Sequence, residues 1–267
     1  MNARPHPGTD RLRWLGHSTV LIELGGVRLL TDPLLRTRVL HLRRSPPLDL
    51  DGLAELDAVL VSHVHYDHLD LPSLRRLGRR TTIAAPRGAG RLLSRRGFTS
   101  VVELSAGEEI RVGPLVVQAV PAEHDARRLL GTRAEALGYV VAGSNRLYFS
   151  GDTALFPGMA ELCSAIDVAL LPIWGWGPSL GPGHLDPVGA ADAVALIRPR
   201  FAVPVHWGTV TFAGMSLLPS PLRARMRRLL VDPPRAFATE VAARGLGTRV
   251  VVTEPGHPVV LGSPAAA

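Results

Sequence analysis

Four side chains that can bind a metal fall within six consecutive residues of this sequence. They are His63, His65, Asp67 and His68, and they directly follow the apolar run 58–61. Imidazole nitrogens and carboxylate oxygens are the ligands expected for zinc and for other first-row divalent metals. The alternative is a polar loop rich in histidine, which would need three histidines and an aspartate to adopt this spacing by chance. The H-x-H-x-D-H pattern therefore predicts a metal site.

The position of this motif in the chain strengthens the prediction. The β-branched content of residues 58–61 predicts a short buried strand that ends at Ser62. His124, Asp152 and His206 each follow another predicted strand. Ligands bind at the carboxyl ends of strands in open α/β sheets, so these side chains can converge on one rim. A lone histidine at a strand end is more often structural, but several in one chain favour a shared site.

Two further polar residues, His17 and Asp32, lie at predicted strand ends near the N-terminus. A carboxylate in such a position commonly orients a neighbouring metal ligand. Both residues are equally well explained as turn-forming polar groups that satisfy the local backbone. The two interpretations stay open at this point.

The order of predicted elements indicates an α/β protein in which helices cover a sheet. Apolar runs and turn residues predict strands over 12–15, 18–24, 27–30, 58–61, 81–85, 100–104, 109–112, 115–120, 138–141, 146–150, 168–172, 201–205 and 249–253. Capping residues and apolar spacing predict helices over 70–77, 88–96, 157–166, 186–197, 222–230 and 236–244. Residues 35–50 and 173–184 are expected to be long loops that form the walls of a pocket. The first of these loops is interpreted as either a flap over the site or a surface segment.

The composition sets broad limits on partners and location. The formal charge is +7 and every cation is an arginine, but the arginines are scattered in pairs and aromatic residues make up only 5%. A nucleic-acid partner is therefore not expected. The single cysteine, Cys163, suits a reducing compartment and a buried position in a helix. Neither an N-terminal signal core nor a transmembrane segment is expected, and a cytoplasmic location is the resulting prediction.

The motifs together resemble the metallo-β-lactamase superfamily, and within it the branch similar to N-acylphosphatidylethanolamine phospholipase D and to ascorbate-6-phosphate lactonase. The matching segments are 14–19, 31–33, 44–47, 63–70, 151–153, 184–187 and 206–209. This resemblance implies a four-layer αβ/βα sandwich, with two mixed sheets flanked by helices. It also implies a single domain over residues 1–267, with about ten N-terminal and about six C-terminal residues expected to be flexible.

The resemblance further implies a set of seven ligands for two divalent metal ions. One ion would be held by His63, His65 and His124, and the other by Asp67, His68 and His206. Asp152 would bridge the two ions. Zinc is the expected metal, with manganese and iron as the alternatives.

These ligands imply a metal-dependent hydrolase that uses a dinuclear-metal-bound hydroxide. The expected substrate is a small molecule or is derived from a lipid, and the bond is a phosphodiester or a lactone. Asp67 and Asp152 would hold the hydroxide and accept its proton. His184 would stabilise the oxyanion or protonate the leaving group, unless it is a loop histidine that precedes the helix cap at Asp186.

Other roles stay open at this stage. Arg127 or Arg128 could receive a phosphate group through paired hydrogen bonds, or both could be solvated surface residues. The alternatives to the hydrolase are a nucleic-acid-processing nuclease of the same superfamily and a non-enzymatic metal-binding or redox protein. A homo-oligomer is compatible with the sequence, which does not specify the oligomeric state.

Overall fold

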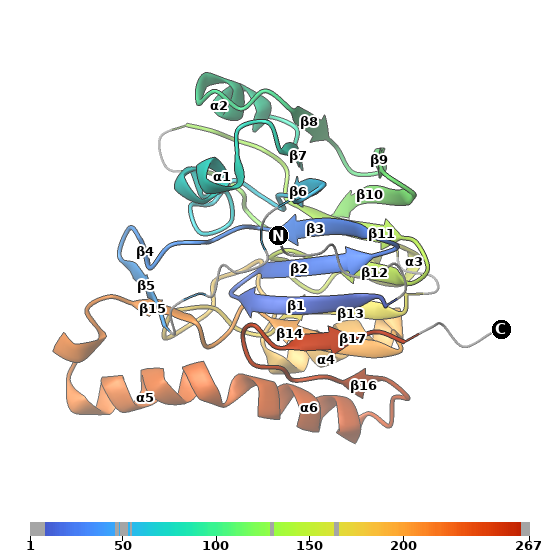
Figure 1. Ribbon diagram of the computed structural model, residues 1–267. Helices are drawn as coiled ribbons and strands as arrows, with labels where there is room; N and C mark the ends of the chain where they lie inside the picture. Colours follow the sequence, from blue (N-terminus) through green and yellow to red (C-terminus); the bar gives the residue numbers. More distant parts are fainter. Residues whose placement is uncertain are drawn as a thin grey trace.

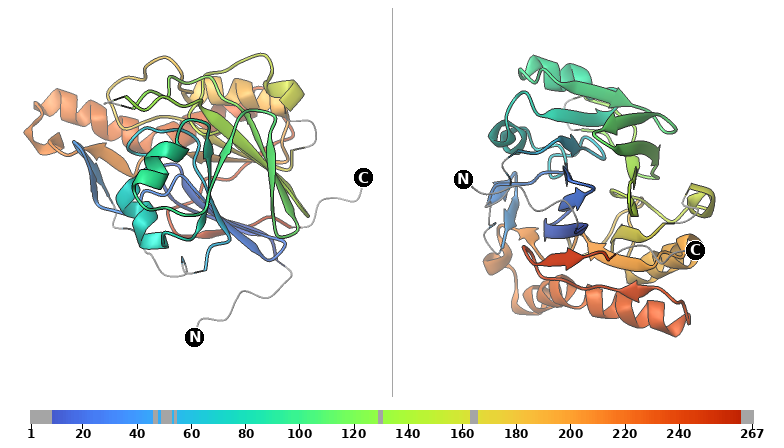
Figure 2. Two further views of the ribbon diagram at one scale, coloured as in Figure 1. Left: turned by 90° about the horizontal axis from the view of Figure 1, so that it is seen from above. Right: turned by 45° about the vertical axis from the view of Figure 1, so that its right-hand side comes forward.

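In the computed structural model, two seven-stranded sheets pack face to face and helices cover their outer surfaces (Figures 1 and 2). The structure describes residues 9–45, 48, 53, 55–128, 131–162 and 166–262. Cys163 and most of the expected flexible ends lie outside the described residues. Within the described part of the chain, no helix has the length and apolarity needed to cross a bilayer.

The first sheet has the strand order β17-β1-β2-β3-β6-β7-β8. Its strands are β1 (Arg11–Gly16), β2 (Thr19–Leu24), β3 (Val27–Thr31), β6 (Ala58–Leu60), β7 (Thr82–Pro86), β8 (Val101–Leu104) and β17 (Pro258–Val260). Strands β3, β6, β7 and β8 are parallel to one another. Because β2 is antiparallel to both β1 and β3, strands β1 and β3 also run in the same direction as β6. The sheet is therefore mixed, as expected.

The second sheet has the strand order β16-β14-β13-β12-β11-β10-β9. Its strands are β9 (Glu109–Val112), β10 (Leu115–Pro121), β11 (Leu137–Ala142), β12 (Arg146–Phe149), β13 (Val168–Pro172), β14 (Phe201–Val205) and β16 (Arg249–Val250). Strands β12, β13 and β14 are parallel, and β10 shares their direction because β11 is antiparallel to both β10 and β12. This sheet is also mixed.

The helices form the outer layers of the sandwich. They are α1 (Leu71–Leu77), α2 (Gly90–Arg95), α3 (Met159–Leu162), α4 (Pro187–Ile197), α5 (Ser220–Val231) and α6 (Pro233–Ala243). The first two cover the first sheet, whereas α3, α4 and α6 cover the second (Figure 2). Three apolar clusters fill the spaces between these four layers, and the central one joins residues such as Trp14 and Ile22 to Tyr139 and Phe149. The expected four-layer arrangement is observed.

Helix α1 shows how local sequence sets an element boundary. The Asp70 side chain accepts a hydrogen bond from the backbone N–H of Ser73 at 3.1 Å, and Pro72 lies in the first turn. Gly78 follows the last turn with a φ of 105°, a conformation that few side chains tolerate. The helix therefore begins and ends where the sequence predicts, directly after the H-x-H-x-D-H motif.

Residues 35–50 differ from the expected long loop. Their described part contains β4 (Arg38–Val39) and β5 (Leu42–Arg44), which form a small third sheet with β15 (Val210–Phe212). The strand β5 is antiparallel to β15, so two segments that are far apart in the sequence lie side by side. The predicted strand 249–253 is shortened to β16, and β17 was not predicted. Such strands of two or three residues carry too few alternating side chains to be recognised.

The two sheets are joined by hydrogen bonds at one edge of the sandwich. The backbone N–H of Leu137 donates to the Ser62 carbonyl at 2.9 Å, and the Tyr139 hydroxyl donates to the Val61 carbonyl at 2.7 Å. The N–H of His206 donates to the His17 carbonyl at 2.9 Å. These hydrogen bonds between protein groups hold the two sheets together at this edge.

Gly151 lies at the same junction, and we predict that alanine there destabilises the fold. The residue has a φ of +62°, and an added Cβ would lie 2.6 Å from the Ser62 Cβ. The strained backbone and the overlap together should cost about 3 kcal/mol of unfolding free energy in Gly151→Ala. Urea denaturation measures the loss. Gly107→Ala is the matched control, because Gly107 has a φ of +91° and open space around it; equal losses in both variants would contradict the packing argument.

Candidate metal centre

The predicted site residues converge at this edge because the relevant strands end there. The strands β1, β3 and β6 run in one direction in the first sheet, and β10, β12 and β14 do so in the second. The residues that follow these strand ends are His17, Asp32, the 63–68 motif, His124, Asp152 and His206. The structure therefore brings the predicted residues together at one rim.

The first group consists of His63, His65 and His124. The His65 Nδ1 lies 3.0 Å from the His63 Nε2 and 3.1 Å from the His124 Nε2. The other ring nitrogen of His124 donates to the Gly183 carbonyl at 2.8 Å, which leaves its Nε2 free of a proton. Three imidazole nitrogens thus face one point.

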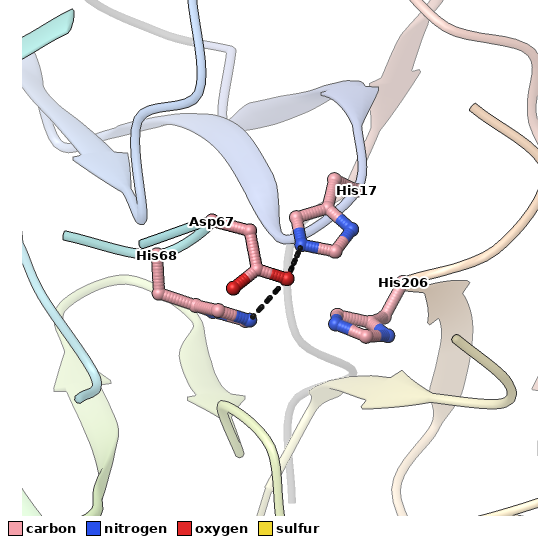
Figure 3. A group of neighbouring side chains, drawn as sticks. All are labelled: His17, Asp67, His68 and His206. Carbon is pink, nitrogen blue, oxygen red and sulfur yellow. Dashed lines mark hydrogen bonds and ion pairs between the residues drawn. The ribbon is translucent and has the colours of Figure 1, made fainter. Parts of the chain in front are cut away.

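The second group consists of His17, Asp67, His68 and His206 (Figure 3). One ligand atom from each residue lies within 4.8 Å of the others. The Nε2 of His17 is 3.1 Å from the Asp67 Oδ2, and the His68 Nε2 is 3.8 Å from the same oxygen. His17 therefore belongs to this group by geometry, although the sequence indicated only a supporting role for it.

Asp152 lies against this second group, with each of its oxygens close to a histidine nitrogen. Its Oδ1 is 3.3 Å from the His206 Nε2, and its Oδ2 is 3.3 Å from the His68 Nε2. The His184 Nε2 lies 3.6 Å from the same Oδ2, and its side chain is 24% exposed. The ligand atoms of His124, Asp152 and His184 also lie within 4.8 Å of one another, so Asp152 lies near residues of both groups.

Asp32 holds His68 in place from behind. Its Oδ2 accepts a hydrogen bond from the His68 Nδ1 at 2.7 Å and another from the Ser62 hydroxyl at 2.6 Å. Its Oδ1 accepts from the Ser62 backbone N–H at 2.7 Å. A carboxylate on one imidazole nitrogen directs the other nitrogen toward a metal, so the geometry favours the supporting role over the simple turn.

Three residues of the cluster have backbones in the left-handed region. The φ angles are 55° for His17, 32° for Asp32 and 61° for His206. Each such residue costs on the order of 1–3 kcal/mol and persists only where its surroundings enforce it. Here the enforcing contacts are the cross-sheet hydrogen bond between His206 and His17 and the bonds around Asp32. Half of the six non-glycine residues with a positive φ in the described part of the chain therefore belong to the candidate site.

Burial lowers the pKa of most of the cluster histidines, whereas burial is outweighed at His68 by the charges of Asp152, Asp67 and Asp32, which raise its pKa well above the usual value. Burial lowers the pKa of His17 to about 3 and that of His124 to about 4, so both imidazoles are neutral at pH 7. Burial alone would raise the pKa of Asp152, but the charges of His206 and His68 outweigh it and hold that pKa well below its usual range. Neutral imidazoles beside ionised carboxylates are the protonation states that bind cations.

Three buried polar atoms in the cluster support the presence of a cation. Among the described residues, the His68 Nε2, the Asp152 Oδ1 and the His206 Nε2 are buried without a hydrogen-bond partner. Buried polar atoms are rarely left unpaired, since each costs about 1–3 kcal/mol. Nitrogens that share a zinc ion lie roughly 3.3 Å apart, close to the spacings within the first group. The residues present therefore fit one or more divalent metals.

A pocket of about 600 Å³ opens over both groups. Its floor includes Asp67, Asp152 and His206, and its walls include Leu40 and Trp176. This volume lies within the range of small-molecule sites, which are mostly apolar with a few converging polar groups. The walls come from the β4–β5 turn and the 173–184 loop, the two segments that the sequence analysis assigned to this purpose.

His41 is a pocket residue to which the sequence analysis assigned no role. It lines the pocket, and its ring centroid lies 5.1 Å from that of Trp176 in an edge-on arrangement. Its position depends on the pairing of β5 with β15, for which the sequence carries no local signal. Spacing alone therefore could not have identified it.

Arg44 supports the site through the backbone. Its buried guanidinium donates to the carbonyls of Leu15 and Leu34 at 2.9 and 2.6 Å, and burial lowers its pKa to about 10. The first of these bonds fixes the turn that carries His17. The only signal in the sequence was the 44–47 segment of the resemblance.

Arg127 and Arg128 have different environments. Arg127 lines the pocket and forms an exposed ion pair with Asp125. Arg128 does not line the pocket; its Nη1 donates to the Val64 and Leu69 carbonyls at 3.0 Å each. This contact favours a role for Arg128 in holding the metal motif over the alternative of binding substrate phosphate.

The sequence comparison defines the class of protein. The sequence model described as "Beta-lactamase superfamily domain" matches residues 27–207, which is more than half of the chain. The chain therefore belongs to this family, and the expected superfamily and its sandwich fold are confirmed.

Two individual relatives match most of this chain. The chain is 33% identical over 224 residues to N-acyl-phosphatidylethanolamine-hydrolyzing phospholipase D 1 of Caenorhabditis elegans, covering 73% of this chain and 63% of that enzyme. It thus spans less than two thirds of the nematode protein. It is 32% identical over 256 residues to a UPF0173 metal-dependent hydrolase of Methanopyrus kandleri, covering 92% of this chain and 98% of the relative.

A solved structure extends the likeness to three dimensions. Igni18, described as a novel metallo hydrolase from the archaeon Ignicoccus hospitalis, aligns with a TM-score of 0.69 and 25% identity. The alignment covers 95% of this chain and 98% of that one. Together with the buried histidine and aspartate clusters, these relatives support the expectation that the chain is a metal-dependent hydrolase.

Proposed function

We propose that this protein is a hydrolase with two divalent metal ions that cleaves phosphodiester bonds in amphiphilic substrates. The observation that carries the proposal is the position of Asp152. Its Oδ1 and Oδ2 each lie 3.3 Å from a buried histidine nitrogen, and the carboxylate also lies within reach of His124. A carboxylate that lies beside histidines of both groups is suited to bridge two cations.

The proposed ligands follow the two groups. His63, His65 and His124 would hold one metal, and Asp67, His68 and His206 would hold the other. Asp152 would bridge them, and all seven residues belong to the clusters that could bind a metal. Zinc is the proposed ion because the donor set is rich in imidazole, and manganese or iron would fit the same donors.

The metal pair, when bound, would lower the pKa of a shared water to about neutrality and polarise the scissile bond. The side chains of Asp67 and Asp152 would orient that water and accept its proton. His17 supports this role, because its Nε2 lies 3.1 Å from the Asp67 Oδ2 and holds that carboxylate in place. His184 would donate a proton to the leaving oxygen, since it reaches the pocket and remains partly exposed.

The pocket walls support a substrate with an apolar portion. Leu40, Trp176 and Leu180 line the cavity above the polar floor, and Leu40 is 66% exposed. An acyl chain could lie against these side chains while the phosphodiester contacts the floor. The relative named as an N-acyl-phosphatidylethanolamine-hydrolyzing phospholipase D supports the same class of bond.

Removal of metal is the test of this proposal. We expect the purified protein to hydrolyse bis(p-nitrophenyl) phosphate, to lose that turnover on treatment with a chelator, and to regain it when zinc or manganese is added back. A simple lactone is the comparison substrate. Turnover of the lactone alone would contradict the phosphodiester proposal, and full metal loading without any turnover would favour the non-enzymatic alternative. Binding of RNA or DNA that weakens steeply with salt would favour the nuclease.

His184 provides a separate test of the proposed proton donor. We expect His184→Asn to lower kcat by about 10²–10⁴-fold on a phosphodiester with an alkoxide leaving group, the range typical of general acid–base residues. The loss on bis(p-nitrophenyl) phosphate should be much smaller, because p-nitrophenolate leaves without needing a proton. Metal content should stay unchanged, because the proposed ligands are intact. Substrates with better leaving groups should lose less activity. A loss of metal equal to that in His63→Ala would show instead that His184 is a ligand.

A further inference from the structure

A second concave surface, separate from the catalytic pocket, is lined by arginines. It has a volume of about 570 Å³ and shares no lining residue with the pocket over the metal centre. Three of its arginines come from α2 and the residue that follows it, and the fourth comes from the turn at 131–133. They are Arg91, Arg95, Arg96 and Arg133.

The positive charge of this pocket is not balanced by an acidic residue in its lining. The lining contains no acidic residue, and within the described part of the chain none of the four arginines forms an ion pair. Glu103 is close to α2, but its Oε1 accepts from the backbone N–H groups of Gly88 and Gly90 at 2.6 and 2.8 Å. That carboxylate keeps its negative charge beside α2, but it is hydrogen-bonded to the backbone and does not line the pocket.

The backbone at Gly88 brings the two walls together. Gly88 has a φ of +102°, and an added Cβ would lie 2.4 Å from the Arg133 carbonyl oxygen. Only glycine allows this approach without a shift of the turn. The turn is further held by Arg128, whose backbone N–H donates to the Thr132 carbonyl at 2.9 Å. The arginines are thus arranged around one cavity by tertiary packing.

Like charges gathered in this way favour an anionic ligand. Guanidinium groups bind phosphate through paired hydrogen bonds, and a phosphate ester carries about −1.5 to −2 charges at neutral pH. Two such groups would balance the four arginines. The volume suits a small molecule, and the lining has no aromatic ring on which a nucleic-acid base could stack.

We propose that this arginine pocket binds a small ligand that carries two phosphate groups, at a site independent of the metal centre. Its occupant would be a sugar bisphosphate, a nucleoside diphosphate or another compound with the same pair of groups. The proposal goes beyond the hydrolase activity and does not depend on it.

Calorimetric titration with fructose 1,6-bisphosphate tests the proposal on the metal-loaded protein. We expect measurable binding that is tighter than that of inorganic phosphate. Replacing Arg95 and Arg133 by serine should weaken it at least about tenfold, since a hydrogen bond to a charged group contributes about 1.5–3 kcal/mol. The matched control replaces Arg235 and Arg249 by serine. Both arginines are exposed and lie outside the pocket, and the formal net charge falls from +7 to +5, as it does in the test variant. That control should bind the probe like the wild type.

Several outcomes would overturn the proposal. These are absence of binding, equal weakening in the control, loss of binding on removal of the metal, or tighter binding of a single-stranded RNA oligonucleotide than of the bisphosphate. Circular dichroism and turnover of bis(p-nitrophenyl) phosphate report whether the variant is folded. If it is not, replacement of Arg91 and Arg96 by serine repeats the test on the same pocket.

Discussion

Replacing Asp152 by asparagine is expected to reduce phosphodiester turnover by on the order of a thousandfold or more, because it removes the charge proposed to bridge both metals. The Asp152 carboxylate lies 3.3 Å from the His68 Nε2 and 3.3 Å from the His206 Nε2. Asparagine has the same size but presents an amide nitrogen to one of these atoms. Steady-state kinetics on bis(p-nitrophenyl) phosphate, with elemental analysis of the same sample, measure the effect.

Asp57→Asn is the matched control for this substitution. The Asp57 carboxylate accepts a hydrogen bond from the Arg28 backbone N–H at 2.8 Å and belongs to none of the clusters that could bind a metal. We expect normal metal content and turnover in the control. Full activity and full metal content in Asp152→Asn would show that the bridging role has been assigned to the wrong residue.

Replacing Asp32 by alanine is expected to weaken both the fold and the metal site, although Asp32 is not a proposed ligand. Its carboxylate is fully buried and accepts hydrogen bonds from the His68 Nδ1 and from the hydroxyl and backbone N–H of Ser62. Leaving these buried donors without an acceptor should lower the free energy of unfolding by about 3 kcal/mol. Metal affinity should fall about 10–100-fold, since His68 loses the group that orients it.

Asp32→Asn separates these two effects. Its amide oxygen can still accept from Ser62, so the loss of stability should be smaller than in the alanine variant. The amide N–H₂ would face the His68 Nδ1 and favour the tautomer with a proton on Nε2, which opposes metal binding. Urea denaturation of the metal-free protein and competition with a chelating dye measure the two quantities. Unchanged metal affinity in both variants would contradict the supporting role of Asp32.

Much of the fold could be predicted because its elements carry local signals. The strands 168–172 and 201–205 were predicted with the bounds that the structure has, since each is an apolar run between clear boundary residues. Helix α1 was predicted from Asp70, Pro72 and Gly78. The strands that were missed, β4, β5, β15 and β17, have two or three residues each. Three of them, β5, β15 and β17, pair with segments distant in the sequence, and β4 pairs with β5.

The site shows the same division between local and distant signals. The approach of His63, His124, Asp152 and His206 to one edge was predicted from strand ends alone. The place of His17 in the second group was not predicted, because it depends on a left-handed turn held by Arg44. Such contacts arise from tertiary packing, which residue spacing does not encode.

The most direct test of the two-metal proposal is the metal content of the wild-type protein, measured by elemental analysis after purification without added metal. We predict about two divalent ions per chain, and about one in the His63→Ala variant, which loses a ligand from only one proposed site. A wild-type protein that binds no metal even after reconstitution, or a single ion that His63→Ala leaves in place, would contradict a dinuclear centre.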